Sequence, residues 1–278
     1  KINPPSLDLA ALAQAEIRRR VTQEHGSWYE PNGGLERFLN LLNHPKAKAL
    51  LDSKGVAVFC LDAGNGLGKT ALVNIIVDYL SQHFQNPYLD KIEILKNFKR
   101  PNRGRILTTP NAAKIAYKDE RDKWTLKGRF TAHKDGANFD RRFHYKNGSE
   151  YDLFTFDQDP DQGESITLHW AVTDEPMDLE HWSGLVSRMR FGGIIFIIQT
   201  PLEGSGWVDD YLKTPERLNK DVFALQLAGE EACIEHGIRG LHQPTDLGRQ
   251  ARARRQHVAD VLVHVRKVPR VIAGLERA

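Results

Sequence analysis

The segment from Ala63 to Thr70, Ala-Gly-Asn-Gly-Leu-Gly-Lys-Thr, constrains the fold of this chain more than any other feature. It follows a short apolar run, Val56 to Leu61, that is typical of a buried parallel strand. It precedes the stretch from Thr70 to Leu80, whose apolar side chains recur at helical spacing. A strand, a glycine-rich turn and a helix in this order predict an α/β fold with a ligand-binding turn at the carboxyl edge of its sheet.

The residues of this turn are suited to holding phosphate groups. Glycines at positions 64, 66 and 68 allow backbone N–H groups to point inward, where they and the positive end of the helix form a cradle for the β and γ phosphates of a nucleotide. Lys69 is expected to reach the phosphate oxygens, and the Thr70 hydroxyl to ligate Mg²⁺. The alternative is a glycine-rich turn with an exposed lysine and no ligand. The predicted nucleotide-binding segment, called the phosphate loop below, is Ala63, Gly64, Asn65, Gly66, Leu67, Gly68, Lys69 and Thr70, with Ala63 where the consensus has glycine.

The composition is that of a soluble globular protein of 278 residues. The net charge is only +3, but residues 239–278 contain nine Arg or Lys and three Asp or Glu, so the basic excess lies at one end. Cys60 and Cys233 show no paired spacing, which favours a reducing intracellular compartment. No apolar run approaches the roughly 18 residues of a membrane helix, and no signal peptide is expected.

Two further apolar runs end in polar residues. The run from Ile166 to Thr173 leads into Asp174-Glu175-Pro176, and the run from Gly193 to Gln199 leads into Thr200-Pro201. A helical pattern, Leu179 to Arg190, lies between them. Strands that alternate with helices and end in polar residues predict an open, mostly parallel sheet with its ligand at the carboxyl edge.

The remaining patterns are more local. Helices are expected over 6–20, 35–42 and 112–123, a strand over 105–109, and an irregular insertion over 85–103. Asn147-Gly148 is a hairpin turn signal between predicted strands at 139–145 and 151–156.

Asp174 and Glu175 supply the two carboxylates that nucleotide hydrolysis needs. One carboxylate holds the Mg²⁺ shell, and the other orients and deprotonates the attacking water. Acidic residues also end strands simply because water solvates them, but their place about a hundred residues after a phosphate loop favours the catalytic interpretation. Thr200 alone would be expected to cap a turn. Together with the other two motifs it is interpreted as a sensor of the γ phosphate.

These motifs occur in the order found in the large terminase subunit of tailed bacteriophages, the ATP-driven motor that packages DNA, and the chain resembles that family from about Trp28 to Gly240. The motifs that carry the resemblance are 64–70, 107–111, 147–149, 156–160, 174–176, 193–202 with Trp207 after it, and 236–240.

The resemblance implies a RecA-like P-loop ATPase domain with a mostly parallel central sheet flanked by helices. A small helical C-terminal segment is expected after it, although the sequence of that segment does not resemble the family. The resemblance also implies that Lys69 and Thr70 bind ATP·Mg²⁺, that Asp174 holds the metal, that Glu175 activates water, and that Thr200 couples hydrolysis to DNA movement. The implied partners are double-stranded DNA, a portal protein on which identical subunits form a ring, and a small terminase subunit. The implied location is the cytoplasm of the host cell, with no membrane contact.

Three departures from the family pattern bear on the site. Relatives often have Asp-Glu-Glu-Pro, so an alignment anchored on Pro176 would put Thr173 in place of the Mg²⁺ aspartate, whereas one anchored on Asp-Glu keeps Asp174 and Glu175. Relatives also place an arginine where this chain has Gly66 or the region of Gln162. Arg188 and Arg190 are therefore candidates for the charge-neutralising arginine, as are Arg100 and Arg103 acting on a neighbouring subunit. Lastly, Trp28-Tyr29-Glu30-Pro31 resembles the start of the adenine pocket, which predicts a nucleotide contact for Tyr29, but Gly34 or Leu35 stands where the family has glutamine.

Three regions are expected: an N-terminal helical segment on the adenine side (1–45), the ATPase core (46–240), and a basic lid or tail (241–278). The full-length family also carries a C-terminal nuclease domain that cuts DNA with clustered carboxylates and divalent metals. No such nuclease is expected here, because the residues after Gly240 contain only Asp246, Asp260 and Glu276 as acids. The arginines of the tail would contact DNA or form a solvated face. Two other functions remain open: a helicase-like nucleic-acid ATPase of the DEAD-box type, for whose second domain there is no room, and an assembly or scaffold protein that binds nucleotide without productive turnover.

Overall fold

The computed structural model describes residues 25–125, 128–159, 166–175, 177–200 and 206–227, together with residues 12, 14 and 15. The chain divides into Lys1–His236 and Gly237–Ala278, and every described residue belongs to the first unit. Most of the helix predicted over 6–20, the predicted tail over 241–278 and Cys233 lie outside the described residues.

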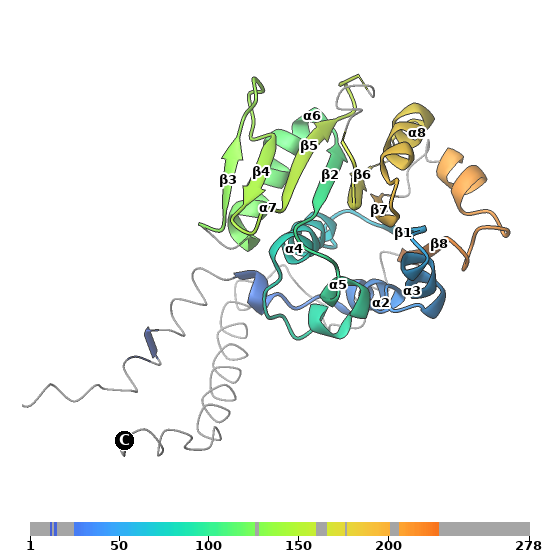
Figure 1. Ribbon diagram of the computed structural model, residues 1–278, viewed down its shortest axis with the longest axis horizontal. Helices are drawn as coiled ribbons and strands as arrows, with labels where there is room; N and C mark the ends of the chain where they lie inside the picture. The colour runs from blue at the N-terminus through green and yellow to red at the C-terminus, as the bar shows by residue number, and fades with distance from the viewer. Residues whose placement is uncertain are drawn as a thin grey trace, which may run out of the picture. The chain divides into compact units, whose positions relative to one another are not determined.

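The described residues form one sheet of eight strands in the order β3-β4-β5-β2-β6-β7-β1-β8 (Figure 1). All neighbouring pairs from β5 across to β8 are parallel, whereas β3 pairs with β4, and β4 with β5, in antiparallel fashion. The mostly parallel sheet predicted from the sequence is therefore confirmed. The strands are β1 (Val56–Ala63), β2 (Arg103–Thr108), β3 (Phe130–His133), β4 (Arg142–Tyr145), β5 (Glu150–Thr155), β6 (Trp170–Asp174), β7 (Gly193–Gln199) and β8 (Val222–Leu227).

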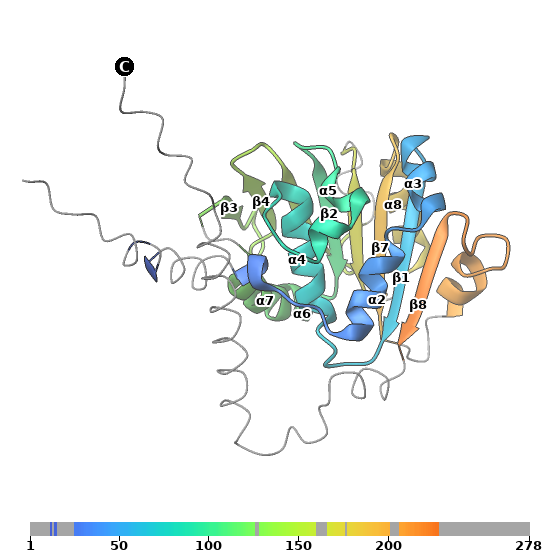
Figure 2. The ribbon, with the colours of Figure 1, turned by 90° about the horizontal axis from the view of Figure 1, so that it is seen from below.

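Helices cover both faces of this sheet, and Figure 2 shows α2 and α4 lying across the strands on one of them. Within the described residues, no helix has the length and apolar character needed to cross a bilayer. The helices are η1 (His25–Trp28), α2 (Gly33–Leu41), α3 (Pro45–Asp52), α4 (Lys69–Gln82), η2 (Leu89–Lys91), α5 (Glu93–Lys96), α6 (Pro110–Lys114), α7 (Ala116–Trp124), α8 (Leu179–Arg188) and the π-helical η3 (Val208–Leu212).

The core is divided by the sheet into two apolar clusters, because side chains along a strand alternate between its faces. Phe59 and Leu61 of β1 pack with α2, α4 and α7 in one cluster. Val58 and Cys60 of the same strand pack with α8 and η3 in the other. With both faces covered, the central parallel strands are buried along their whole length, which explains why their sequences are continuous apolar runs.

Several predicted elements differ in detail from the structure. The hairpin at Asn147-Gly148 is confirmed, with β4 and β5 on either side and Gly148 at a φ of +87°. The helix predicted over 112–123 is interrupted at Ile115, so it forms the two helices α6 and α7. The sequence predicts an irregular insertion over 85–103, but this insertion contains η2 and α5. The Asn86 side chain starts this insertion by accepting hydrogen bonds from the backbone N–H groups of Tyr88 and Leu89.

Candidate functional site

The phosphate loop joins the carboxyl end of β1 to the amino end of α4. Gly66 and Gly68 have φ angles of +81° and +84°, in the left-handed region that favours glycine. The first hydrogen bond of α4 runs from the Leu72 N–H to the Gly68 carbonyl at 3.0 Å. The N–H groups of the first three helix residues thus have no acceptor within the helix, and they face the end where the helix dipole is positive. This geometry suits an anion, as the sequence predicts.

Lys69 is held over this loop and is only 7% exposed. Its Nζ donates to the carbonyl oxygens of Ala63 at 2.5 Å and Gly64 at 3.1 Å, and to the Thr200 Oγ1 at 2.9 Å. Burial lowers the pKa of Lys69, while the nearby carboxylates of Glu175 and Asp174 oppose that shift. The ammonium group therefore lies between the loop and the acidic residues.

The two acidic residues lie at the carboxyl end of β6, in different environments. Asp174 is buried, and its burial raises the pKa of its carboxyl group to about 6. Burial raises the pKa of the Tyr117 phenol, on α7, and the nearby Asp174 carboxylate raises it further. Glu175 has a φ of +78°, which is strained for a residue with a side chain. This conformation turns the chain at the end of β6, where the Glu175 N–H donates to the Ile198 carbonyl.

Thr200 connects the two halves of the site. Its hydroxyl accepts from Lys69 and donates to either the Asn65 Oδ1, at 3.0 Å, or the Glu175 Oε1, at 3.2 Å. This contact results from the strand order, because β7 lies between β1, which carries the phosphate loop, and β6, which carries the carboxylates (Figure 1). The structure thus brings together Lys69, Glu175 and Thr200, which belong to three separate sequence motifs.

Asn32 also belongs to this region, although none of the sequence motifs above includes it. Its Nδ2 donates to the Leu67 carbonyl at 3.0 Å, and its Oδ1 accepts from the Leu35 N–H at 2.9 Å as the N-cap of α2. A single side chain therefore fixes the start of α2 to the phosphate loop. An asparagine before a helical pattern is the sequence signal of an N-cap, but the bond to Leu67 is a tertiary contact.

Tyr29 lies in the core three residues before this cap. It is 6% exposed, and its ring packs edge-on against Trp124 with 5.4 Å between ring centroids. Its carbonyl accepts a hydrogen bond from the Asn86 side chain. These described contacts do not include the phosphate loop, so the predicted contact of Tyr29 with the base stays a prediction.

The candidate arginines lie away from the phosphate loop of their own subunit. The Arg188 carbonyl accepts from the Leu168 N–H, just before β6 begins, and its guanidinium donates to the Gly184 carbonyl at 2.6 Å. Arg190 is exposed before β7, whose seven residues separate its two ends by about 20 Å. Arg190 and the backbone of Arg188 therefore lie at the amino edge of the sheet, opposite Thr200, whereas the Arg188 side chain runs back along α8 and lines a small pocket with Leu107 and Phe154.

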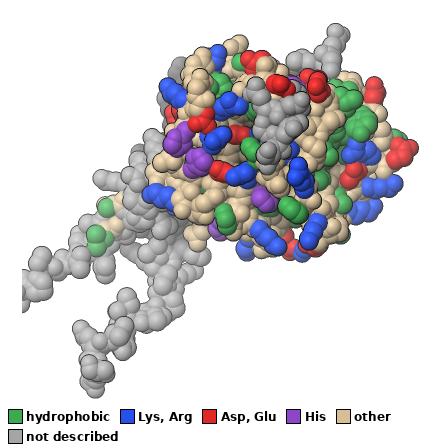
Figure 3. All heavy atoms as spheres, turned by 45° about the horizontal axis from the view of Figure 1, so that its top comes forward, with side chains coloured by type: hydrophobic (Ala, Val, Ile, Leu, Met, Phe, Trp, Pro, Cys, Tyr) green, Lys and Arg blue, Asp and Glu red, His purple; other side chains and the backbone are tan. Residues whose placement is uncertain are grey.

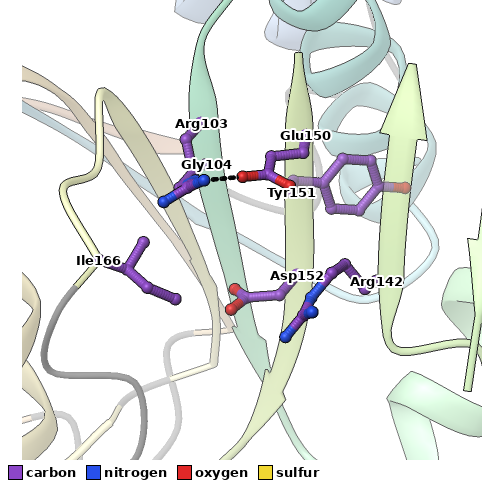
Figure 4. A pocket seen from close by; sticks show the side chains of 7 residues that line it. All are labelled: Arg103, Gly104, Arg142, Glu150, Tyr151, Asp152 and Ile166. Atoms are coloured by element: carbon purple, nitrogen blue, oxygen red, sulfur yellow. Dashed lines mark ion pairs between the residues drawn. The ribbon is translucent and has the colours of Figure 1, made fainter. Parts of the chain in front are cut away.

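The two arginines considered for a neighbouring subunit already have partners. Arg100 donates to the carbonyl oxygens of Phe98 and Tyr79, so it stabilises the carboxyl end of α4. Arg103 forms an ion pair with Glu150 across a pocket of about 170 Å³ on β2 and β5 (Figure 4). Arg103 is the first residue of β2, and Glu150 is the first residue of β5. The pocket therefore also lies towards the amino edge of the sheet, away from the phosphate loop.

The residues at the carboxyl edge fit a Mg²⁺ ion that arrives with a nucleotide. The described residues contain no group of three or more His, Cys, Asp or Glu that could hold a metal by themselves. Thr70 and Asp174 instead offer one hydroxyl and one carboxylate from neighbouring parts of the site. Mg²⁺ at phosphate sites is commonly held by one or two such protein oxygens, with phosphates and water completing its shell.

Comparison with known proteins gives matches to phage terminases. The large terminase of a thermophilic bacteriophage (crystal form 2) superposes with a TM-score of 0.50 and 16% identity, over 74% of this chain and 48% of that one. The large terminase of bacteriophage HK97 also superposes with a TM-score of 0.50, at 13% identity, over 80% of this chain and 47% of that one. This chain thus spans about half the length of these terminases. No protein-family model and no curated protein sequence matches the chain. The resemblance predicted from the motifs is confirmed at the level of the fold: this chain has the mostly parallel α/β fold of the phage large terminases.

Proposed function

We propose that this chain is an ATP-hydrolysing motor domain that powers translocation of double-stranded viral DNA into a procapsid. The observation that carries the proposal is the contact of the Thr200 hydroxyl with both Lys69 and Glu175 at the carboxyl edge of the sheet. The fold shared with the terminases of the thermophilic phage and of HK97 supports the motor over other nucleotide-binding proteins.

The proposed chemistry is an in-line attack of water on the γ phosphorus. Lys69 and the N–H groups at the start of α4 bind the phosphate oxygens. Glu175 orients the water and takes its proton while the bond from the γ phosphorus to the bridging oxygen of ADP breaks. Mg²⁺, when held by Thr70 and Asp174, supplies neutralisation of the phosphate charge. Thr200 contacts both the cation and the base, so its hydrogen bonds depend on whether the γ phosphate is present.

Hydrolysis by the wild type and by Glu175→Ala, with and without duplex DNA and portal, tests this function. Because a general base contributes about 10²- to 10⁴-fold, the variant is expected to lose at least that part of turnover. Lys69→Ala should abolish nucleotide binding. Wild-type turnover no higher than that of Glu175→Ala under every condition would refute the motor, and binding retained by Lys69→Ala would show that the phosphate loop has been misinterpreted.

The contacts with DNA, the portal and a small terminase subunit, the ring of subunits and the location in the host cytoplasm belong to the same proposal. On the face drawn in Figure 3, basic and acidic side chains of the described residues are interspersed. The described side chains of this face therefore form no surface of a single charge for the phosphate backbone of DNA, which attracts clusters of Lys and Arg. The proposal assigns DNA contact to no part of that face.

A second candidate is a scaffold protein that binds nucleotide without productive turnover. The position of Arg190 at the opposite edge of the sheet favours it, because an arginine that neutralises the transition state accelerates such reactions by about 10³- to 10⁵-fold. Titration with a fluorescent ADP analogue, beside the turnover measurement above, separates the two: a scaffold binds the analogue but hydrolyses no ATP even with DNA and portal.

A further inference from the structure

A second cluster of charged side chains lies at the carboxyl end of β1, next to the phosphate loop. Asp62, on β1, is 8% exposed, and its carboxylate accepts from the Gln199 Nε2 at 2.8 Å. The same carboxylate forms an ion pair with Lys213, whose side chain is 12% exposed. Lys213 also donates to the Asp209 Oδ1 at 2.9 Å. This cluster includes none of the residues to which the proposed hydrolysis assigns a role.

The cluster is adjacent to both elements that contact the nucleotide in the proposed mechanism. Asp62 and Gln199 are paired in the β1–β7 register. Asp62 stands two residues before Gly64, and Gln199 stands directly before Thr200. Any displacement of Lys213 therefore acts on the base of the phosphate loop and on the residue before Thr200.

A second contact ties the same part of the chain to the other half of the site. The Trp207 Nε1 donates to the Met177 carbonyl at 2.6 Å, and Met177 stands two residues after Glu175. Between the two contacts, Val208 and Leu212 of η3 are fully buried against the sheet. Residues 206–213 are called the tether segment below. One end of this segment is bonded to Asp62, next to the phosphate loop, and the other end to Met177, next to Glu175.

The chemistry of the cluster is unusual for a purely structural contact. Burying an ion pair costs solvation free energy, and apolar side chains of similar size are often at least as stabilising. Although burial opposes it, hydrogen bonds to Asp209 and Asp62 raise the pKa of Lys213, so the lysine stays charged. The tether segment also contains a π-helical turn, a rare conformation that is frequent at functional sites.

We propose that Lys213 and Trp207 are positioning residues, which hold the tether segment against both halves of the nucleotide site and so set the geometry of Thr200 and Glu175. The proposal rests on the hydrolytic function proposed above. The tether segment is bonded next to the phosphate loop, through Asp62, and next to Glu175, through Met177. When the hydrogen bonds of Thr200 with Lys69 and Glu175 change, the tether segment is therefore the first part of the chain to which the change is transmitted.

Lys213→Met tests this role, with Lys220→Met, an exposed lysine of the same region, as the matched control. A small misplacement of the reacting groups lowers turnover without weakening phosphate binding, so kcat is expected to fall about 10- to 100-fold with the KM for ATP nearly unchanged. Trp207→Phe, which removes the hydrogen bond to Met177 together with part of the ring volume, should likewise lower kcat and leave the KM for ATP nearly unchanged. Lys220→Met should match the wild type in both constants.

A spectroscopic readout accompanies the kinetics. The Trp207 ring lies 6.0 Å from that of Trp182, so its fluorescence reports on the position of the tether segment. Addition of an ATP analogue to the wild type should change tryptophan emission, and this change should be absent in Lys213→Met. A purely structural role would lower the melting temperature of Lys213→Met but leave kcat per folded protein and the emission change intact, and that result would overturn the proposal.

Two cases need a further measurement: a Lys213→Met variant that does not fold, and a wild type that does not hydrolyse ATP. If Lys213→Met does not fold because Asp62 loses its partner, the double variant Asp62→Asn/Lys213→Met removes both charges and should show the same loss of kcat. A folded double variant with wild-type kcat and emission change would refute the positioning role while the hydrolytic function stands. If the wild type itself hydrolyses no ATP, the proposed function fails, and the nucleotide-dependent emission change alone decides whether Lys213 positions the segment.

Discussion

At the scale of single residues, the site depends on one hydroxyl. Thr200 is 7% exposed and lies within hydrogen-bond distance of Lys69, at the start of α4, and of Glu175, directly after β6. No other described hydrogen bond joins Lys69 to the end of β6, so the Thr200 side chain is the direct link between phosphate binding and the proposed base.

Replacing Thr200 by valine keeps the shape of the side chain and removes this link. We expect kcat for ATP to fall about tenfold or more because Glu175 loses a fixed partner, while Lys69 still binds phosphate. Stability should fall by about 1 kcal/mol for the lost hydrogen bonds. Steady-state kinetics and urea unfolding check both values. Thr200→Ser keeps the hydroxyl and should retain most of the turnover; equal losses in both variants would argue against the link.

The buried carboxyl of Asp174 predicts a dependence of stability on pH. Its pKa is about 6 in the folded protein against an ordinary value of 3.8, so the folded state holds the proton more tightly than the unfolded chain. The stability from the neutral acid is fully present below the ordinary pKa of 3.8 and is lost as the pH rises through about 6. The free energy of unfolding is expected to fall by roughly 1–3 kcal/mol over this range. Urea unfolding without nucleotide or Mg²⁺ should show this loss in the wild type but not in Asp174→Asn. Parallel pH curves for the two proteins would contradict it.

At the scale of elements, local patterns identify the βα unit well. The strand before the phosphate loop, the helix after it and β7 lie where the apolar runs place them, because these periodicities reflect which side chains each element buries. The edge strands β3 and β8 were not predicted. Their sequences contain polar residues and have short or interrupted apolar runs, so only pairing with a neighbouring strand identifies them.

The glycines of the phosphate loop differ in what they contribute. A Cβ at Gly64 or at Gly66 would meet no atom within 4 Å, but only Gly66 has a left-handed φ. Gly66→Ala is therefore expected to cost about 1–2 kcal/mol of backbone strain, and Gly64→Ala much less. Urea unfolding of the two variants isolates the backbone effect because neither adds a clash. Equal stabilities would show that the loop relaxes freely around position 66.

At the scale of the whole molecule, the length of the sheet separates Arg190 from the site. Arg190 is exposed at the amino edge, so within one subunit it cannot contact a nucleotide at the carboxyl edge. If an arginine completes the site, it comes from another part of the chain or from a second subunit, as expected for a ring.

Arg190→Ala should leave ATP turnover and affinity unchanged at protein concentrations too low for self-association. At concentrations that allow assembly, mixing Arg190→Ala with Lys69→Ala subunits should restore turnover if Arg190 acts across a subunit boundary, because each variant then supplies what the other lacks. Activity lost in the dilute variant would contradict the position of Arg190 described above. Arg188→Ala is a poor probe because that side chain is only 4% exposed.

The sequence by itself determined the local parts of this protein: the strand, loop and helix around Lys69, the carboxylates after one apolar strand, and Thr200 after another. These follow from chain-local properties, namely periodicity, glycine content and polar residues at strand ends. Only the tertiary structure decided that β7 lies between β1 and β6, that Asn32 reaches Leu67, that Asp62 pairs with Lys213, and that Arg190 lies at the opposite edge. The physical reason is that strand order and buried ion pairs depend on packing between residues far apart in the chain, which no short window of sequence contains.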